Sequence, residues 1–135
     1  MDVGAIETSA AGMRAQRLRM ETAALNLANA ETTGFSTEER DGRVEHVPYR
    51  RRTVEFSVGA DGRPVGRVVE DASPFRVEHE PGHPHAGPDG MLLRPNVHPL
   101  AEMTELMAAS RAYEANVAAL DTAKAMHAAA LRILA

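Results

Sequence analysis

A single stretch near the C-terminus constrains this chain more than any other feature. It opens on Asn96-Val97-His98-Pro99, where a capping residue and a proline near the first turn favour a helix start, and no glycine or proline follows up to Leu134. At about 1.5 Å per residue the helix reaches roughly 50 Å, more than a globule of this length comfortably encloses. We therefore expect part of it to contact other chains.

The same stretch carries side chains at alternating spacings of three and four, as in a coiled-coil seam. The predicted seam positions are Met103, Leu106, Ser110, Tyr113, Val117, Leu120, Lys124, His127, Leu131 and Leu134. The seam is weakest at the serine, the lysine and the histidine. It predicts a long helix that packs against another helix.

A second helix is predicted from about Val3 to Ala30, a stretch without proline that ends at Glu31-Thr32-Thr33-Gly34. Apolar residues recur every seven positions, with Ala10 and Ala24 between them and Arg17 as an interruption: Ile6, Met13, Met20 and Leu27. Leu18 and Leu25 form a separate apolar stripe. A helix with two apolar sides needs two neighbours.

Between the helices, from Arg40 to Pro95, glycine and proline become frequent. Alternating segments at 52–58 and 63–70 flank Gly59-Ala60-Asp61-Gly62, which is typical of a hairpin, and residues 80–90 form a long irregular loop. We predict an α+β fold. Residues 1–34 and 96–135 form a discontinuous helical domain, and residues 35–95 form a small β-rich insertion.

Charge and cysteine content narrow the classes of partner. The chain has 15 Lys+Arg and 19 Asp+Glu, a net charge of −4, and no cysteine. Such a balance gives no general attraction to nucleic acid or anionic lipid, and a thiolate site or disulfide is excluded. No secretory signal or transmembrane span is readable near the N-terminus. We expect protein partners and no nucleic acid.

Two clusters have chemistry that must be weighed. His79, His83, His85 and His98 are potential metal ligands, but their proline- and glycine-rich loop fixes no ligand geometry, so we predict no metal. Arg50-Arg51-Arg52 predicts a salt-bridged strand entry, with acidic residues nearby in the sequence at Glu38, Glu39, Asp41, Glu45 and Glu55.

Nothing in the sequence indicates catalysis. There is no G-x-S-x-G, no phosphate-cradling glycine loop and no H-E-x-x-H motif. We predict that the protein is not an enzyme, uses no cofactor and takes no small-molecule substrate.

Two amides near the end of the first helix, Asn26 and Asn29, allow two interpretations. They either end the helix, because asparagine is a poor helix former, or hydrogen-bond across a helix interface and fix its register. The periodicity does not choose between them.

Three separated motifs resemble one family. The stretch from Ser9 to Gln16, followed by Asn26-Leu27-Ala28-Asn29-Ala30 and Glu31 to Gly34, resembles the N-terminal signature of flagellar rod, hook and hook-associated proteins. Ser110 to Val117, followed by Thr122-Ala123-Lys124, resembles their C-terminal helix. Ser73 to Arg76, Pro81 to Ala86 and Pro95-Asn96-Val97 are similar to proximal-rod members of the FlgC type. Leu25 departs from the family, which usually has asparagine there.

The resemblance implies a structural subunit of the bacterial flagellar basal body. Such a subunit is exported through the flagellar type III apparatus without a cleaved signal peptide, and assembles in the periplasm with copies of itself and other proximal-rod and rod-junction proteins. Its terminal helices would form the assembly interface, including Asn26, Asn29 and Asn116 besides the seam residues, and would transmit torque. The alternative from another class is a cytoplasmic coiled-coil adaptor or regulator that binds one partner helix.

Overall fold

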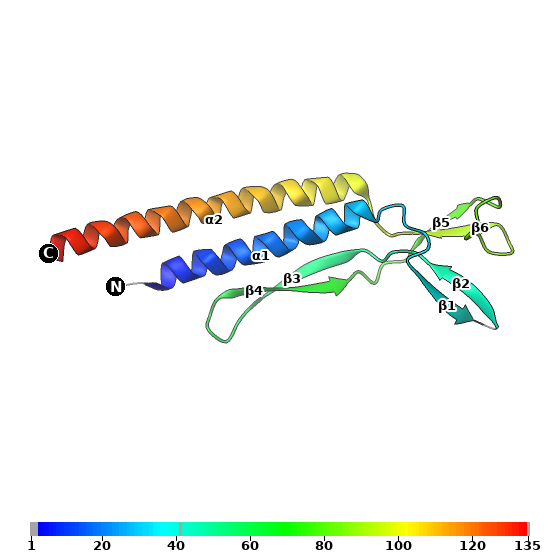
Figure 1. Ribbon diagram of the computed structural model, residues 1–135, viewed down its shortest axis with the longest axis horizontal. Helices are drawn as coiled ribbons and strands as arrows, with labels where there is room; N and C mark the ends of the chain where they lie inside the picture. The colour runs from blue at the N-terminus through cyan, green and yellow to red at the C-terminus, as the bar shows by residue number, and fades with distance from the viewer. Residues whose placement is uncertain (1–2, 41, 135) are drawn as a thin grey trace.

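The computed structural model describes residues 3–40 and 42–134. Two long helices, α1 (Val3–Ala28) and α2 (Pro99–Leu134), lie side by side and antiparallel, and the strands between them in sequence extend along and beyond one end of the pair (Figure 1). The strands are β1 (Ser36–Arg40), β2 (Arg43–Val47), β3 (Arg52–Val58), β4 (Pro64–Glu70), β5 (Arg76–His79) and β6 (Met91–Arg94). The predicted α+β class is confirmed.

The strands pair consecutively into three antiparallel two-stranded sheets, β1 with β2, β3 with β4, and β5 with β6. The predicted hairpin is β3–β4, where Val58 pairs with Pro64 and the Gly59 N–H bonds the Arg63 carbonyl at 2.8 Å. Gly62 has φ +75° in this turn, a conformation that favours glycine. The predicted irregular loop at 80–90 joins β5 to β6.

Helix α1 has two neighbours, as predicted, although Leu25 of the second predicted stripe is 52% exposed. It packs along α2 on one side and against the β3–β4 hairpin on the other. A Cβ on Gly12 would lie 2.6 Å from Asn116 Oδ1, so the glycine lets the helices approach closely. On the other side, a Cβ on Gly66 of β4 would lie 3.2 Å from a methyl group of Leu18.

Along α2, the residues that face inward agree with the predicted seam at every second position. At the positions between, the inward residue comes one place earlier in the sequence than predicted. Four residues of the predicted seam are half-buried, as expected: Leu106, Tyr113, Leu120 and His127. At the positions between these four, the inward residues are buried or half-buried: Glu102, Ala109, Asn116, Ala123 and Ala130. Of the residues that the seam predicted there, Met103, Lys124 and Leu131 are exposed, and Ser110 and Val117 are half-buried. The side chain of Leu134 lies outside the described residues. Periodicity favoured large apolar residues, but the close helix approach selects small and polar ones.

Along α1, the fully buried positions are likewise small or polar. They are Ala11, Ala15, Thr22, Ala23 and Asn26. Ile6, Met13 and Met20 are half-buried, and Leu27 is exposed. At about 100° per residue, the predicted stripe lies to one side of the face that carries Gly12 and Ala23. The large apolar side chains of this helix therefore border the helix–helix contact instead of filling it.

Replacing Gly12 by leucine tests the close approach of the helices. We expect the free energy of unfolding to fall by about 1 kcal/mol, because overpacking of roughly 2 kcal/mol against Asn116 exceeds the gain of about 0.8 kcal/mol in helix propensity. Ala24→Leu, at an exposed position of the same helix, should change it by less than about 0.5 kcal/mol. Denaturant unfolding followed by circular dichroism measures both, and an unchanged midpoint for Gly12→Leu would contradict the packing.

Candidate functional site

A buried polar junction joins the end of α1, the start of α2 and the start of β3. At its centre Asn26 is 1% exposed and makes four hydrogen bonds. Its Nδ2 donates to the Arg52 carbonyl at 2.7 Å and to Glu102 Oε2 at 2.8 Å, and its Oδ1 accepts from the Tyr49 hydroxyl and the Arg52 N–H, both at 2.9 Å. An amide offers two donors and two main acceptor sites, so this side chain is saturated.

Glu102 is the second centre of the junction, a carboxylate only 1% exposed. Besides Asn26, it accepts a hydrogen bond from Arg51 Nε at 2.7 Å, and the Arg51 guanidinium also bonds Asp71 Oδ2 at 3.0 Å. A buried carboxylate is tolerated only when it is paired and hydrogen-bonded. The predicted salt-bridged strand entry is present at Arg51, but its acidic partners come from the turn after β4 and from α2 instead of from the residues nearby in sequence.

Asn96 extends the junction to the segment that precedes α2. Its Oδ1 accepts from the Arg51 N–H at 2.8 Å, and its Nδ2 donates to Ser73 Oγ at 2.8 Å. The Arg51 carbonyl in turn accepts from the Asp71 N–H at 2.8 Å. The start of β3, the turn after β4 and the approach to α2 are therefore bonded together.

The charges of the junction reinforce one another. Burial works to lower the pKa of Arg51, but its hydrogen bonds to Glu102 and Asp71 outweigh that effect and leave the pKa above its ordinary value. The Ser73 backbone N–H, the Ser73 hydroxyl and Arg51 together hold the pKa of Asp71 below its ordinary value. Both groups therefore remain charged at neutral pH.

A small apolar cluster of Ala30, Tyr49 and Val97 also forms part of the core. The Tyr49 ring meets Phe35 edge-on with the ring centroids 5.3 Å apart, and burial raises the pKa of its phenol. Because its hydroxyl donates a hydrogen bond to Asn26, Tyr49 belongs to both the apolar cluster and the polar junction.

Each of the two interpretations offered for Asn26 and Asn29 describes one of these residues. Asn26 bonds across the helix interface to Glu102, which fixes the register of α1 against α2. Asn29 is bonded locally: its Nδ2 donates to the Leu25 carbonyl at 2.9 Å, and its Oδ1 accepts from the Thr32 hydroxyl at 3.3 Å. Asn29 therefore ends the helix.

A second polar pair crosses the two helices one to two turns away. Arg19 of α1 forms a hydrogen-bonded ion pair with Glu105 of α2. That bond, more than any other influence, holds the pKa of Glu105 below its ordinary value. The helices are thus tied by an ion pair in addition to the saturated amide.

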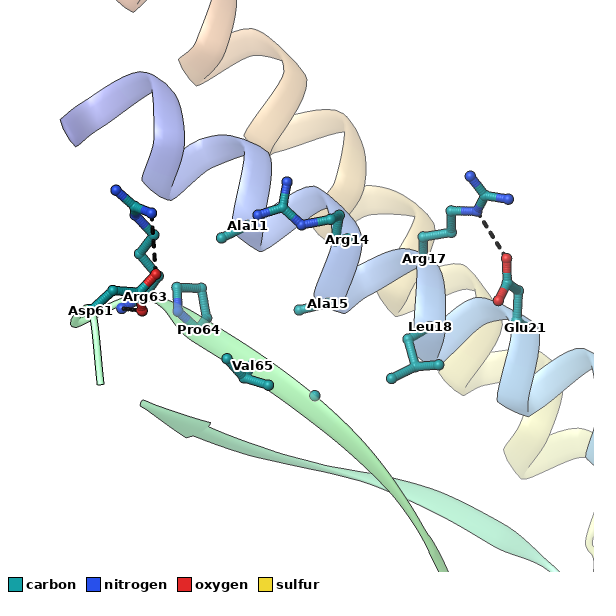
Figure 2. Close-up of a pocket in the computed structure, with 11 residues that line it drawn as sticks. Ala11, Arg14, Ala15, Arg17, Leu18, Glu21, Asp61, Arg63, Pro64 and Val65 are labelled. Atoms are coloured by element: carbon teal, nitrogen blue, oxygen red, sulfur yellow. Dashed lines mark hydrogen bonds and ion pairs between the residues drawn. The ribbon is translucent and has the colours of Figure 1, made fainter. Parts of the chain in front are cut away.

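An open groove of about 480 Å³ separates α1 from the β3–β4 hairpin (Figure 2). Ala11, Ala15 and Leu18 line it from the helix, and Pro64 and Val65 from the strand. Its charged groups are the arginines Arg14, Arg17 and Arg63 with the carboxylates Glu21 and Asp61. Its lining residues include no histidine and no hydroxyl group, and its carboxylates are paired, Glu21 with Arg17 and Asp61 with Arg63.

The histidines of the predicted loop do not come together as one set of four. His79 and His98 are exposed, whereas His83 and His85 are half-buried beside His46 of β2. Over residues 3–40 and 42–134, no group of three or more His, Asp or Glu side chains has the geometry of a metal site. Neither helix, within the part described, has the length and hydropathy of a membrane span.

The residues predicted to form the assembly interface differ in how far their side chains are exposed in the single chain. Asn26 is buried within the chain. Leu27, Met103 and Leu131 are exposed. The rest, apart from Leu134, are half-buried: Ile6, Met13, Met20, Asn29, Leu106, Tyr113, Asn116, Val117 and Leu120. The exposed apolar side chains of α2 also include Leu100 and Met107, which the seam did not contain.

Known families match both ends of the chain. The model of the flagella basal body rod protein family matches residues 6–35, and that of the flagellar basal body rod FlgEFG protein C-terminal region matches residues 89–133. The flagellar basal-body rod protein FlgC of Bacillus subtilis strain 168 is 35% identical over 95% of both chains. That of Salmonella typhimurium strain LT2 is 37% identical over 89% of this chain and 88% of its own.

The chain belongs to the FlgC family of flagellar basal-body rod proteins. FlgC of Borreliella burgdorferi is also similar, at 30% identity over 96% of this chain and 95% of its own. The protein is thus a structural subunit of the flagellar basal-body rod. The two matched segments contain Asn26, Asn96 and Glu102, whereas Arg51 and Asp71 lie between them.

Replacing Asn26 by alanine tests the junction of this rod protein. We expect the free energy of unfolding to fall by about 3 kcal/mol, because Glu102, the Tyr49 hydroxyl and the Arg52 backbone each lose a buried partner. Asn29→Ala, which removes local bonds only, should lower it by less than about 1 kcal/mol. Calorimetric or denaturant unfolding compares the two, and equal losses would contradict the assignment.

Proposed function

We propose that this FlgC-family chain builds the proximal rod by packing the exposed apolar face of its terminal helices against neighbouring subunits. The observation that carries the proposal is a patch at the start of α2, where Leu100 is 78%, Met103 50% and Met107 55% exposed. Positions i, i+3 and i+7 lie on one face of a helix. Large apolar side chains are thus concentrated on the outside while small and polar ones occupy the contact with α1.

The energetics favour a covered patch. Burying a side chain of this size fully stabilises by about 1.5–3 kcal/mol. Because a rod repeats each contact in every copy, three such side chains per subunit add up along the assembly. Contacts of this kind propagate instead of closing, as a filament requires.

The lengths of the helices support further contacts between subunits. Helix α2 has 36 residues and α1 has 26, and Gly12 lies opposite Asn116 in the antiparallel pair. Continuing that register, residues 126–134 of α2, about two and a half turns, extend past the described start of α1. Exposed Met126 and Leu131 lie in that end, where a neighbouring helix could cover them.

In this proposal the protein acts mechanically and without catalysis. The residues 1–34 and 96–135 form the unit that packs in the rod, and residues 35–95 form an insertion fastened to it by the junction. Torque passes from subunit to subunit through repeated helix packing. Within a subunit it passes between the helices through Asn26, Glu102 and the ion pair of Arg19 with Glu105.

The proposed partners are copies of this chain, other proximal-rod and rod-junction proteins, and the flagellar type III export apparatus, which passes the chain without removal of a signal peptide. A core of small side chains is compatible with export in an unfolded state. Among the described residues, the buried apolar side chains larger than alanine are Tyr49, Leu92, Val97, Pro48 and Pro95, so the fully buried apolar area that unfolding must expose is small.

Met103→Asp tests the patch, because Met103 is exposed in the single chain. The isolated protein should keep its free energy of unfolding within about 0.5 kcal/mol. Rod assembly should fail, since a charge desolvated in a repeated contact costs several kcal/mol. Complementation of a strain that lacks the gene, at matched secreted levels, gives motility and the yield of basal bodies.

Ala101→Asp is the matched control, because it adds the same charge at an exposed position of the same turn that is neither three nor four residues from Leu100, Met103 or Met107. It should leave more motility than Met103→Asp. Normal motility with Met103→Asp would contradict the assignment of the patch to assembly.

A further inference from the structure

Three histidines from distant parts of the sequence meet at the end of the molecule away from the chain termini. The rings of His46 in β2 and His85 in the β5–β6 loop are stacked, with centroids 4.0 Å apart and planes 24° from parallel. The His83 ring meets that of His85 edge-on at 5.2 Å. All three are half-buried.

The His85 ring also contacts the segment that joins α1 to β1. Its Nδ1 lies 2.9 Å from the hydroxyl of buried Thr33. A Cβ on Gly34 would lie 2.4 Å from His85 Cε1, so the ring rests directly on the glycine backbone. His85 therefore fastens the β5–β6 loop both to the segment between α1 and β1 and to strand β2.

The bonding pattern requires uncharged rings. The His85 backbone N–H donates to His83 Nδ1 at 3.1 Å, which is possible only while that nitrogen keeps its lone pair. Two protonated rings stacked at 4.0 Å would repel each other. Among the described residues, the charges that act on His85 are those of His46 and His83, and the Glu31 and Glu80 side chains are paired with Arg94.

We propose that His46, His83 and His85 form a pH-sensitive latch that holds the loop of residues 80–90 against β2 and the segment between α1 and β1 near neutral pH and releases it in mild acid. The loop has its own turns and stays closed at its base, where the Glu80 N–H bonds the Gly90 carbonyl at 2.9 Å. Release therefore undocks the loop as a unit. The proposal goes beyond assembly through the helices and does not depend on it.

The direction of the pH effect follows from the cluster. Burial, followed by the neighbouring His46 and His83, lowers the pKa of His85. The neutral ring is thus the form that docks. Docking is complete above the ordinary histidine pKa of about 6.5 and is lost as the pH falls through that value and then through the lower docked pKa.

Amide hydrogen exchange by NMR on the full chain tests the latch. The amide of His85, which donates to His83 Nδ1, should lose protection, after correction for intrinsic rates, as the pH is lowered from about 7.5 to about 5.5. The His46→Phe variant keeps an aromatic ring but removes one charge, so its protection should fall much less. The His98→Phe variant changes an exposed histidine outside the cluster and should behave as the wild type.

Three results would overturn the proposal. They are protection that does not change with pH, an equal fall in wild type and His46→Phe, and a His85 pKa measured from its Cε1–H resonance at or above the value of a free histidine. The resonance titration uses the unaltered protein, so the test stands even if His46→Phe fails to fold.

Discussion

The four hydrogen bonds of one buried amide hold the helices and the strands in a single arrangement. Asn26 satisfies the Glu102 carboxylate, the Tyr49 hydroxyl and both backbone groups of Arg52. Sliding α1 along α2 by one turn would leave a buried charge and several buried polar groups without partners, at a penalty of several kcal/mol. The antiparallel register, and with it the close contact at Gly12, follows from this constraint.

The distribution of side-chain size then explains how the subunit can be stable enough to fold and still need neighbours. Gly12, Ala23 and Ala109 occupy positions where the helices approach, so their contact buries little apolar area. The larger apolar side chains remain on the outside, including Leu100 and Met107. In the proposed rod assembly, the apolar area that is left out of the intramolecular core is available for contacts between subunits.

Much of the fold could be predicted from the sequence, because helix periodicity, helix-stop residues and the Gly59 to Gly62 turn act locally. The exact inward face of α2 could not. Periodicity ranks Met103 above Glu102 as an inward residue, and only the distant Arg51 and Asn26 make the carboxylate the buried one. Asn26 could be recognised as a candidate from the sequence. The roles of Arg51, Tyr49 and Asn96 could not, because their partners are distant in the sequence and meet them only in the folded chain. The stacking of His46 on His85 joins residues from separate hairpins, and no local pattern indicates it.

Native-state hydrogen exchange at the junction tests the central claim most directly. The N–H groups of Arg51 and Arg52 donate to the side chains of Asn96 and Asn26 instead of to a neighbouring strand. If the junction holds the fold together, these two amides open only with global unfolding, and their opening free energies equal that of the whole chain. The amides of the β1–β2 hairpin should open at lower free energy. Exchange of Arg51 and Arg52 as fast as that of the hairpin would contradict the account.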